Sequence, residues 1–355
     1  MKLRISCYIF SLALILPVPW AMADMPPIID THVHLNQQSP TGFRGASPTL
    51  QFNSAVEAAL ERMDRFGIRR ILLMPPPLAP NSSVTYDLEA LRFAPGKYPD
   101  RISLLGGGGS LNAMIHGTPA EAVTDNIKQR FRAQAEQIIA YGGVGFGEIA
   151  AHHLSLRLMG PQHPYEWTPL DHPLFLLLAD IAAEKGVPID LHLDLVPEDM
   201  ERPDRPIFNT ATPSHLKANL PGFERLLSHN PNAKITWAHA GTDPLGTRRP
   251  QMQHQLLGRH SNLYMSLRLS QNGAAPFLAL DESRILKPGW LALLRDFPER
   301  FMLGSDFFHS ASGSTQRGPT EESLDNFRVL LRQLPPELAD AIAHGNAERL
   351  YRLSR

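Results

Sequence analysis

Histidine and acidic residues stand at the ends of several apolar segments of this sequence. His32 and His34 are separated by one residue in the segment Asp-Thr-His-Val-His. Alternate residues of a β-strand project to the same side, so a strand here would place both imidazoles in one space. Two neighbouring imidazoles suit a divalent cation. The spacing therefore predicts a metal-binding pair, and Asp30, the next residue in the alternation, is expected to brace one imidazole.

Four later segments carry a residue of the same kind where an apolar run ends. These residues are Glu148, His192, His239 and Asp306. Each has a structural alternative when taken alone, because buried ion pairs, core hydrogen-bond donors and helix caps use the same residue types. A closed parallel barrel would bring the carboxyl ends of all its strands around one mouth. Taken together, the four residues and the histidine pair favour a shared metal centre.

The elements that would position these residues alternate regularly along the chain. Short apolar or β-branched runs predict strands at residues 28–33, 70–74, 101–105, 144–149, 188–193, 234–238, 263–267 and 301–304. Segments of helical periodicity predict helices at residues 54–66, 119–141, 173–185, 214–229, 250–259, 289–295 and 320–334. Eight such units favour an α/β fold, a (β/α)8 TIM barrel with long loops on its C-terminal face. A doubly wound open sheet is the alternative that periodicity leaves open.

The first 23 residues are typical of a secretory signal peptide. A short positive start is followed by an apolar run and by Ala21-Met22-Ala23, a small-residue cleavage site. The run is shorter than the ~20 residues of a membrane span, although an uncleaved anchor is the alternative. We therefore expect a periplasmic or secreted barrel domain at residues 24–355. The single cysteine, Cys7, lies in the signal segment, so a metal site in the barrel would use His, Asp and Glu.

Composition narrows the classes of partner. The chain has 355 residues, of which 43% are hydrophobic, and its 34 Lys+Arg and 35 Asp+Glu give a formal net charge of −1. This balance is typical of a globular protein, because disorder requires low hydrophobicity and high net charge. It also lacks the basic character of a nucleic-acid-binding surface. We expect a small-molecule substrate, no nucleic acid and no membrane attachment after signal cleavage, and a homo-oligomer remains open.

The ordered set of motifs resembles the amidohydrolase superfamily, in particular the amidohydrolase-2-type branch related to carboxymuconate-semialdehyde decarboxylases. The resemblance rests on Asp30-Thr-His-Val-His34, Gly147-Glu148-Ile149, Leu191-His192, Ala238-His239-Ala240-Gly241, Gly304-Ser305-Asp306 and Gly345-Asn-Ala-Glu-Arg-Leu-Tyr351. These motifs follow one another in order over nearly the whole chain after residue 24. The fold that the resemblance implies is a (β/α)8 barrel.

The resemblance also implies roles for the site residues. His32, His34 and Asp306 would bind the principal metal, and His192 would join them or bind a second ion. His239 would be a metal ligand in a two-metal centre and a base or polarising group in a one-metal centre. Glu148 would bridge or ligate metal. The ligand types favour Zn²⁺, with Mn²⁺ and Fe²⁺ as alternatives, and the sequence leaves one or two ions open.

Three weaker candidates lie near the expected strand ends. Arg268 follows the seventh strand and would clamp a substrate carboxylate, or pair with an acid such as Asp281. His152 follows Glu148 in a long segment and is a candidate for substrate contact, with an exposed loop histidine as the alternative. The four glycines at residues 106–109 are interpreted as flexible loop backbone near the pocket.

Hydrolysis is the reaction that this set of residues favours. Water activated by the metal would attack an ester, lactone or amide carbonyl, with Asp306 and His239 as the catalytic residues. Metal-dependent non-oxidative decarboxylation of a small unsaturated or aromatic carboxylic acid is the alternative within the same branch. A catalytically inactive exported binding protein is the alternative from another class.

Overall fold

The molecule is built around a closed ring of parallel strands. This computed structural model describes residues 25–36, 48–82, 86–160, 163–269, 278–310 and 319–354. The predicted signal peptide at residues 1–23 lies outside the described residues. The ring strands are β1 (Ile28–Leu35), β2 (Ile68–Leu73), β3 (Ile102–Gly107), β4 (Gly143–His153), β6 (Ile189–Leu193), β9 (Ile235–Ala240), β10 (Leu263–Leu267) and β11 (Phe301–Leu303).

Pairing between the first and last ring strands closes the barrel. β11 pairs with β10 on one side and with β1 on the other, where Asp30 stands opposite Leu303. The Thr31 hydroxyl also donates to the Leu303 carbonyl at 2.8 Å. Because all eight strands run parallel, their carboxyl ends meet at one mouth. The predicted (β/α)8 barrel is confirmed, and the eight expected strands are the eight ring strands.

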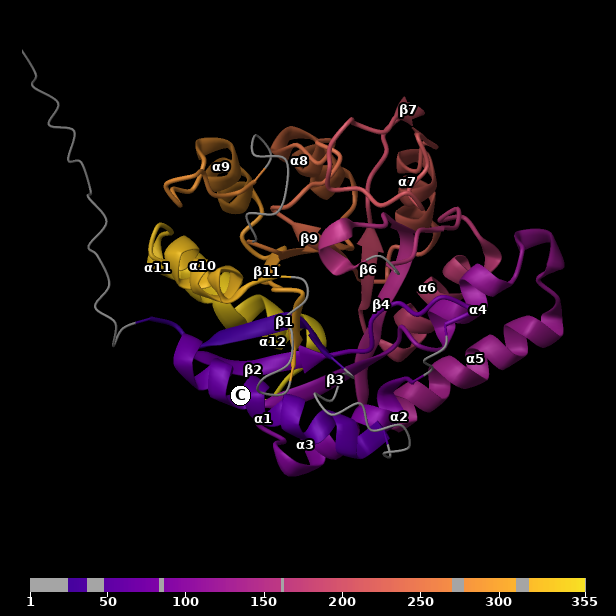
Figure 1. The fold of residues 1–355 in the computed structure, drawn as a ribbon, viewed down its shortest axis with the longest axis horizontal. Helices are drawn as coiled ribbons and strands as arrows, with labels where there is room; N and C mark the ends of the chain where they lie inside the picture. Colours follow the sequence, from indigo (N-terminus) through magenta and orange to yellow (C-terminus); the bar gives the residue numbers. More distant parts are fainter. Residues whose placement is uncertain are drawn as a thin grey trace, which may run out of the picture.

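Helices lie outside the ring, as Figure 1 shows. They are α1 (Pro48–Phe66), α2 (Leu88–Leu91), α3 (Phe93–Lys97), α4 (Leu111–Gly117), α5 (Asp125–Ala140), α6 (Pro173–Lys185), α7 (Leu220–His229), α8 (Pro250–Arg259), α9 (Pro288–Asp296), α10 (Glu321–Leu331), α11 (Pro336–Asp340) and α12 (Asn346–Tyr351). Within the described ranges, every helix is too short or too polar to cross a bilayer.

Two of the predicted helices start six residues before the helices that form. The predicted helix at residues 214–229 begins only at α7, because β8 (His215–Leu216) pairs with β7 (Met200–Glu201) as an antiparallel hairpin. The predicted helix at residues 119–141 begins at α5, where the Thr124 side chain accepts a hydrogen bond from the Ile127 N–H. This cap provides the start signal.

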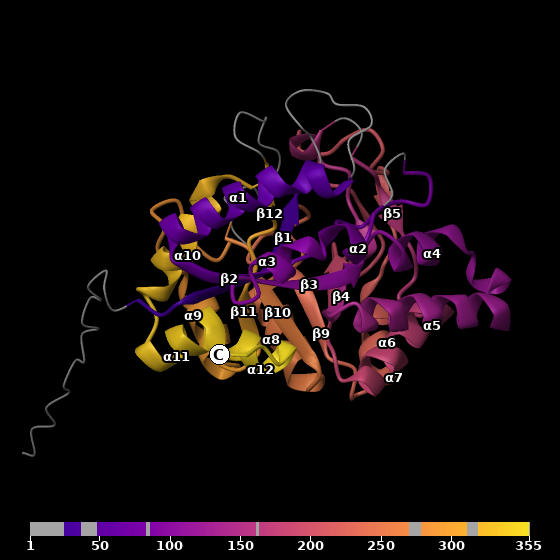
Figure 2. The ribbon, with the colours of Figure 1, turned by 90° about the horizontal axis from the view of Figure 1, so that it is seen from below.

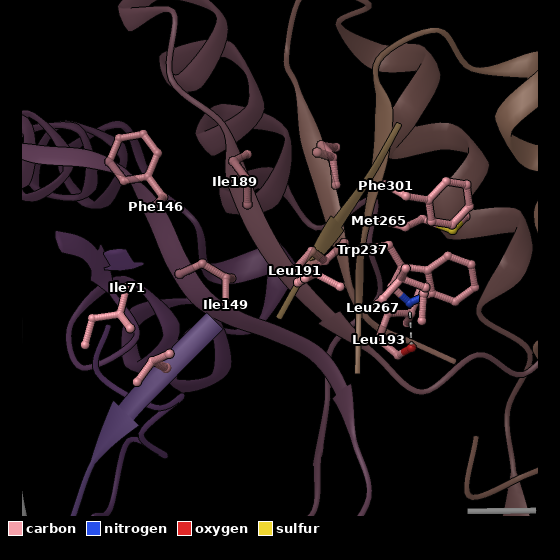
Figure 3. Packing of buried hydrophobic residues seen from close by; sticks show 14 of the residues in the cluster. Ile71, Phe146, Ile149, Ile189, Leu191, Leu193, Trp237, Met265, Leu267 and Phe301 are labelled. Atoms are coloured by element: carbon pink, nitrogen blue, oxygen red, sulfur yellow. Dashed lines mark hydrogen bonds between the residues drawn. The ribbon is translucent and has the colours of Figure 1, made fainter. Parts of the chain in front are cut away.

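The apolar core lies mainly between the ring and the helices. Phe146, Ile149 and Leu191 of β4 and β6 belong to one buried cluster, shown in Figure 3. Trp237 of β9 packs in the same cluster, and its indole N–H donates to the Leu193 carbonyl at 2.9 Å. Because these outward-facing residues anchor the strands, the alternate residues can remain polar and point toward the axis.

The C-terminal motif closes the end of the barrel away from the mouth. In Figure 2, α12 and the C-terminus lie at the bottom, whereas β5 (Glu166–Trp167) and β12 (Phe307–His309) lie toward the top. Leu350 and Tyr351 of α12 pack with inner-barrel residues, including Met302 of β11. Asn346 donates to the Pro298 and Phe301 carbonyls, both at 2.8 Å. The Gly-Asn-Ala-x-Arg-Leu-Tyr run is therefore an anchor for the barrel floor.

Candidate metal centre

The two histidines of the first strand point into one space, as their spacing predicted. His32 Nε2 and His34 Nε2 lie 3.1 Å apart at the carboxyl end of β1. His34 Nδ1 lies 3.0 Å from the Met74 carbonyl oxygen, which can only accept a hydrogen bond. Nδ1 therefore donates, and the lone pair of Nε2 faces the centre of the site.

Asp190, rather than Asp30, braces His32. His32 Nδ1 lies 3.0 Å from Asp190 Oδ1, and both side chains are fully buried. Asp30 instead accepts hydrogen bonds from the backbone N–H groups of Ser305 and His32, at 2.9 and 3.3 Å. The expected role of Asp30 was wrong, because β1 carries register irregularities that break the simple alternation. Its carboxylate holds the β1 and β11 ends together.

Glu148 lies between two pairs of imidazoles. Its Oε2 atom is 3.3 Å from His34 Nε2 and 3.6 Å from His32 Nε2. Its Oε1 atom is 2.8 Å from His192 Nδ1 and 3.3 Å from His239 Nε2. Thus one carboxylate from β4 faces ligand candidates from β1, β6 and β9.

Asp306 completes the side of the centre nearest to β1. Its Oδ1 atom lies 3.5 Å from His34 Nε2 and 3.9 Å from His32 Nε2, whereas its Oδ2 atom lies 2.9 Å from Arg268 Nη1. Asp306 and His239 both have positive φ angles, of 56° and 63°. Such backbone conformations are uncommon outside glycine and concentrate at functional sites.

The buried carboxylates around the candidate metal centre favour a positive charge among the imidazoles. Burial opposes protonation of His32, but the Asp190 and Glu148 carboxylates raise its pKa well above 6.5. Burial also opposes ionisation of Glu148, but the charge of His32, with smaller contributions from His192 and His239, holds its pKa well below 4.5. By contrast, burial lowers the pKa of His239 to about 3, so this imidazole is neutral at physiological pH.

The donor set fits a divalent cation. One ligand atom each from His32, His34 and Asp306 lie within 4.8 Å of one another, and the same holds for His32, Glu148 and His239. Imidazole lone pairs and carboxylate oxygens face each other here, an arrangement that a bound cation reconciles. All six residues predicted as metal ligands therefore lie in one cluster, and their individual roles remain predictions.

A cavity of about 1230 Å³ opens onto this centre. Glu148, His192, His239 and Asp306 form part of its wall. Apolar residues that follow the ring strands form another part, among them Pro76, Leu78, Met159, Ile207 and, in β12, Phe308. Four arginines also line the cavity: Arg157, Arg205, Arg248 and Arg268.

Arg268 and His152 have different placements. Arg268 lines the cavity and pairs with Asp306, whereas Asp281, the alternative partner, accepts N–H groups of its own loop.

His152 is buried, with Nδ1 2.6 Å from the Asp194 carbonyl oxygen, and does not line this cavity. His153 lines it instead. Two residues of β4 advance against one of β6 between Ala150 and His152, and such a bulge re-aims the following side chains.

Sequence reasoning missed three charged residues around the centre. Asp190 and Asp194 flank His192 in the alternating pattern Asp-x-His-x-Asp of residues 190–194, a signal that strand periodicity could have provided. Arg248 contacts Asp194 from the segment after β9, and its Nη2 atom lies 3.2 Å from Asp194 Oδ1. Nothing in the local sequence around Arg248 indicates this long-range contact.

Comparison with known proteins agrees with this architecture. The amidohydrolase-2 family model, described as Amidohydrolase, matches residues 29–353. No curated protein sequence matches the chain.

Solved structures share the fold at low sequence identity. A protein from Pseudomonas putida assigned as a 2-pyrone-4,6-dicarboxylic acid hydrolase is 15% identical with a TM-score of 0.51, covering 93% of this chain and 98% of that chain. 2,6-Dihydroxybenzoate decarboxylase from Rhizobium is 14% identical with a TM-score of 0.53, covering 93% and 99%. A dihydroxybenzoic acid decarboxylase from Polaromonas, solved with manganese and 2-nitroresorcinol, is 14% identical with a TM-score of 0.53, covering 93% and 98%.

The family match therefore spans the ring strands, the clustered histidines and carboxylates, and the barrel-floor motif. This chain belongs to the amidohydrolase-2 family, as its ordered motifs predicted.

Proposed function

We propose that this protein is a metal-dependent hydrolase that cleaves an ester, lactone or amide bond of a small molecule. The observation that carries the proposal is the position of Glu148. Its two oxygens face different imidazole pairs, His32 and His34 on one side and His192 and His239 on the other. A carboxylate shared between two ligand sets suits a pair of cations.

In this proposal His32, His34 and Asp306 would hold one cation, His192 and His239 would hold a second, and Glu148 would contribute to both sets. Zn²⁺ is the proposed ion, because imidazole and carboxylate ligands suit it. Mn²⁺ is the first alternative, since the Polaromonas neighbour binds manganese. When bound, such ions lower the pKa of water and polarise a carbonyl oxygen.

Asp306 would move the proton during hydrolysis. Burial opposes its ionisation, but the Arg268 guanidinium holds its pKa below 3.8, so the carboxylate is ionised at neutral pH and able to accept a proton. It would take that proton from the attacking water and return it to the leaving group. Neutral His239 keeps a lone pair for the cation.

Decarboxylation is the second candidate, and Arg268 is the observation that favours it. Its guanidinium lines the cavity beside Asp306, where it would bind the carboxylate of a carboxylic acid substrate. The same contact would serve a hydrolase whose substrate carries a carboxylate. Product chemistry therefore separates the two reactions.

The test uses metal-reloaded enzyme and a panel of lactones, esters, amides and aromatic carboxylic acids in ¹⁸O-labelled water. Hydrolysis incorporates one ¹⁸O atom into the product acid, whereas decarboxylation releases CO₂ without incorporation. We expect incorporation, and we expect Asp306→Asn to lower kcat by roughly 10²- to 10⁴-fold, the usual contribution of a general acid–base group. Full turnover by Asp306→Asn, or CO₂ release, would contradict the proposal. An enzyme that binds no divalent ion would favour the inactive binding protein.

We also propose that residues 1–23 direct export and are removed, leaving one barrel domain at residues 24–355 in the periplasm or outside the cell. The small-residue site at Ala21-Met22-Ala23 supports this proposal. The intact mass of the exported protein should correspond to a chain that begins at Asp24.

A further inference from the structure

Asp194 and Arg248 form a buried ion pair beside the candidate metal centre, although the proposed function gives neither a role as a ligand. Asp194 Oδ1 lies 3.2 Å from Arg248 Nη2, and the two side chains are 6% and 3% exposed. Buried ion pairs of this kind are costly to desolvate and seldom add net stability. We therefore looked to the neighbouring metal centre, rather than to fold stability, for the role of this pair.

Asp194 contacts the far side of the His192 ring. Its Oδ2 atom lies 3.2 Å from His192 Nε2 and also accepts the Leu154 N–H at 2.9 Å. A carboxylate that already accepts one N–H and pairs with a guanidinium is ionised, and it accepts a hydrogen from Nε2. His192 Nδ1 is then the ring nitrogen that faces Glu148 Oε1, at 2.8 Å, and His239 Nε2, at 3.0 Å.

Arg248 links Asp194 to β9, the ring strand next to β6. Its Nη1 atom donates to the Ala238 and His239 carbonyls, at 2.9 and 3.3 Å. The guanidinium also lies over the Trp237 ring, 5.1 Å from the centroid. Arg248 thus holds the carboxyl end of β9 at the point where the His239 backbone takes its positive φ of 63°.

We propose that Asp194 and Arg248 are a positioning pair for the half of the metal centre formed by His192 and His239. Asp194 accepts the hydrogen of His192 Nε2, which leaves the lone pair on Nδ1, the nitrogen that faces the cation site. Arg248 ties Asp194 to the backbone of His239, so that the ligands from β6 and β9 keep their relative placement. The inference rests on the metal centre of the proposed function, and it concerns affinity for the ion rather than the reaction.

Cation binding to chelator-stripped protein tests the pair. Zn²⁺ and Mn²⁺ are titrated into the wild type, Asp194→Asn, Arg248→Lys and Arg248→Met, with stoichiometry and dissociation constants measured by competition with a chromogenic chelator. Asp194→Asn keeps the shape of the side chain but loses the charge, and Arg248→Lys keeps the charge but loses the planar fork. We expect each variant to weaken binding of one of the two cations, the one held by His192 and His239, by roughly ten- to hundred-fold, the usual effect of removing a ligand's supporting contact. The affinity for the other cation should stay unchanged.

Arg70→Lys is the matched control. Arg70 is a buried arginine of β2 whose Nη1 atom donates to Ser103 Oγ at 3.0 Å, away from the cation ligands. A structural effect of removing a buried guanidinium would lower the unfolding midpoint of Arg70→Lys and Arg248→Lys alike and leave cation affinity unchanged. An affinity loss confined to the Asp194 and Arg248 variants supports the inference.

The double variant and the wild type provide further tests. Because the two residues act as one unit, Asp194→Asn with Arg248→Met should lose little more affinity than the worse single variant. In the metal-loaded wild type, a long-range ¹H–¹⁵N spectrum, with His192 assigned from His192→Gln, should show the proton on Nε2. A proton on Nδ1 overturns the inference even where variants fail to fold.

The two proposals fail in different ways. Wild-type protein that binds no divalent ion contradicts the proposed function and this inference together. Wild-type protein that binds ions, with Asp194 and Arg248 variants that bind them equally well, contradicts this inference alone.

Discussion

Arg268 contacts Asp306 through one carboxylate oxygen, while the other oxygen faces the histidine pair. The two functions of this carboxylate are therefore divided between its atoms. One oxygen is turned to the proposed cation, and the other is held by a guanidinium that keeps the carboxylate ionised.

The Arg268→Met substitution gives a pH prediction. Arg268 lowers the pKa of Asp306, so its removal raises that pKa. If Asp306 must be ionised to accept a proton, the acid limb of the kcat–pH profile should move to higher pH in the variant. A profile measured between pH 4 and 9 on metal-reloaded enzyme checks the direction. Arg225→Met, which removes an exposed partner of Asp171, is the control and should leave the limb in place.

Individual residues also mark the limits of prediction from the sequence. His32, Glu148, His192, His239 and Asp306 could be singled out because each ends an apolar run, and strand ends converge in a parallel barrel. Asp190 alternates with His192 in the sequence, but its role was missed because its contact with His32 is made between β6 and β1. His152 was a candidate for substrate contact, but a bulge in β4 shifts the alternation, and His153 lines the cavity in its place.

At the scale of elements, two of the four glycines at residues 106–109 end β3, and the other two lie in a tightly packed turn after it. A Cβ atom at Gly108 would collide with the Pro75 carbonyl oxygen and lie 2.7 Å from the Pro76 oxygen and 2.9 Å from the Glu148 oxygen. The Gly108 carbonyl also accepts the Leu78 N–H at 2.8 Å. The interpretation of residues 106–109 as flexible loop backbone was wrong, because two of them belong to β3 and close approach of neighbouring backbones requires glycine at residue 108.

Gly108→Ala should therefore disturb the strand that carries Glu148. Displaced backbone at this point costs about 1–3 kcal/mol, the usual range for overpacking, and should also weaken cation binding. Chemical denaturation and cation titration check both effects. Gly258→Ala is the matched control, because nothing lies within 4 Å of a Cβ there in α8, and alanine should stabilise the helix by about 0.5–1 kcal/mol. Equal stability of the two variants would refute this account.

Strands and helices could be predicted where their hydrophobic pattern is set by neighbouring residues in the sequence. The ring strands are mostly buried and rich in apolar residues, and such segments stand out in the sequence. The start of α7 was missed because residues 215–216 pair with residues 200–201, and a short antiparallel hairpin leaves little periodic signal. Tertiary pairing outweighs helical propensity in that segment.

At the scale of the whole molecule, the proposed first cation site joins the two ends of the barrel. His32 and His34 come from β1, and Asp306 follows β11, the strand that closes on β1. The ligands therefore come together only when the ring is closed. A cation bound to them stabilises the closed barrel at the expense of the unfolded chain.

Divalent ions should accordingly raise the unfolding midpoint of the chelator-stripped protein. At a free ion concentration one hundred times the dissociation constant, the gain in unfolding free energy is about 2.7 kcal/mol per site. Calorimetry or fluorescence-monitored unfolding with and without Zn²⁺ or Mn²⁺ measures it. His34→Gln should lose most of the gain while the metal-free midpoint changes less. An unfolding midpoint that does not respond to either ion would contradict a metal centre in the barrel.

Ring closure also sets the order in which the centre can be assembled during synthesis. The Thr31 hydroxyl and the Leu303 carbonyl that it contacts are 272 positions apart, and Asp306 lies beyond that point. A nascent chain presents its first two imidazoles early, but bringing such distant segments together carries a loop-closure cost that only the full set of ring contacts can offset. We therefore expect tight cation binding at this site only in chains that have been translated through residue 306. Truncated translation products that end before residue 306 lack the Asp306 ligand, so we expect them to leave this site metal-free.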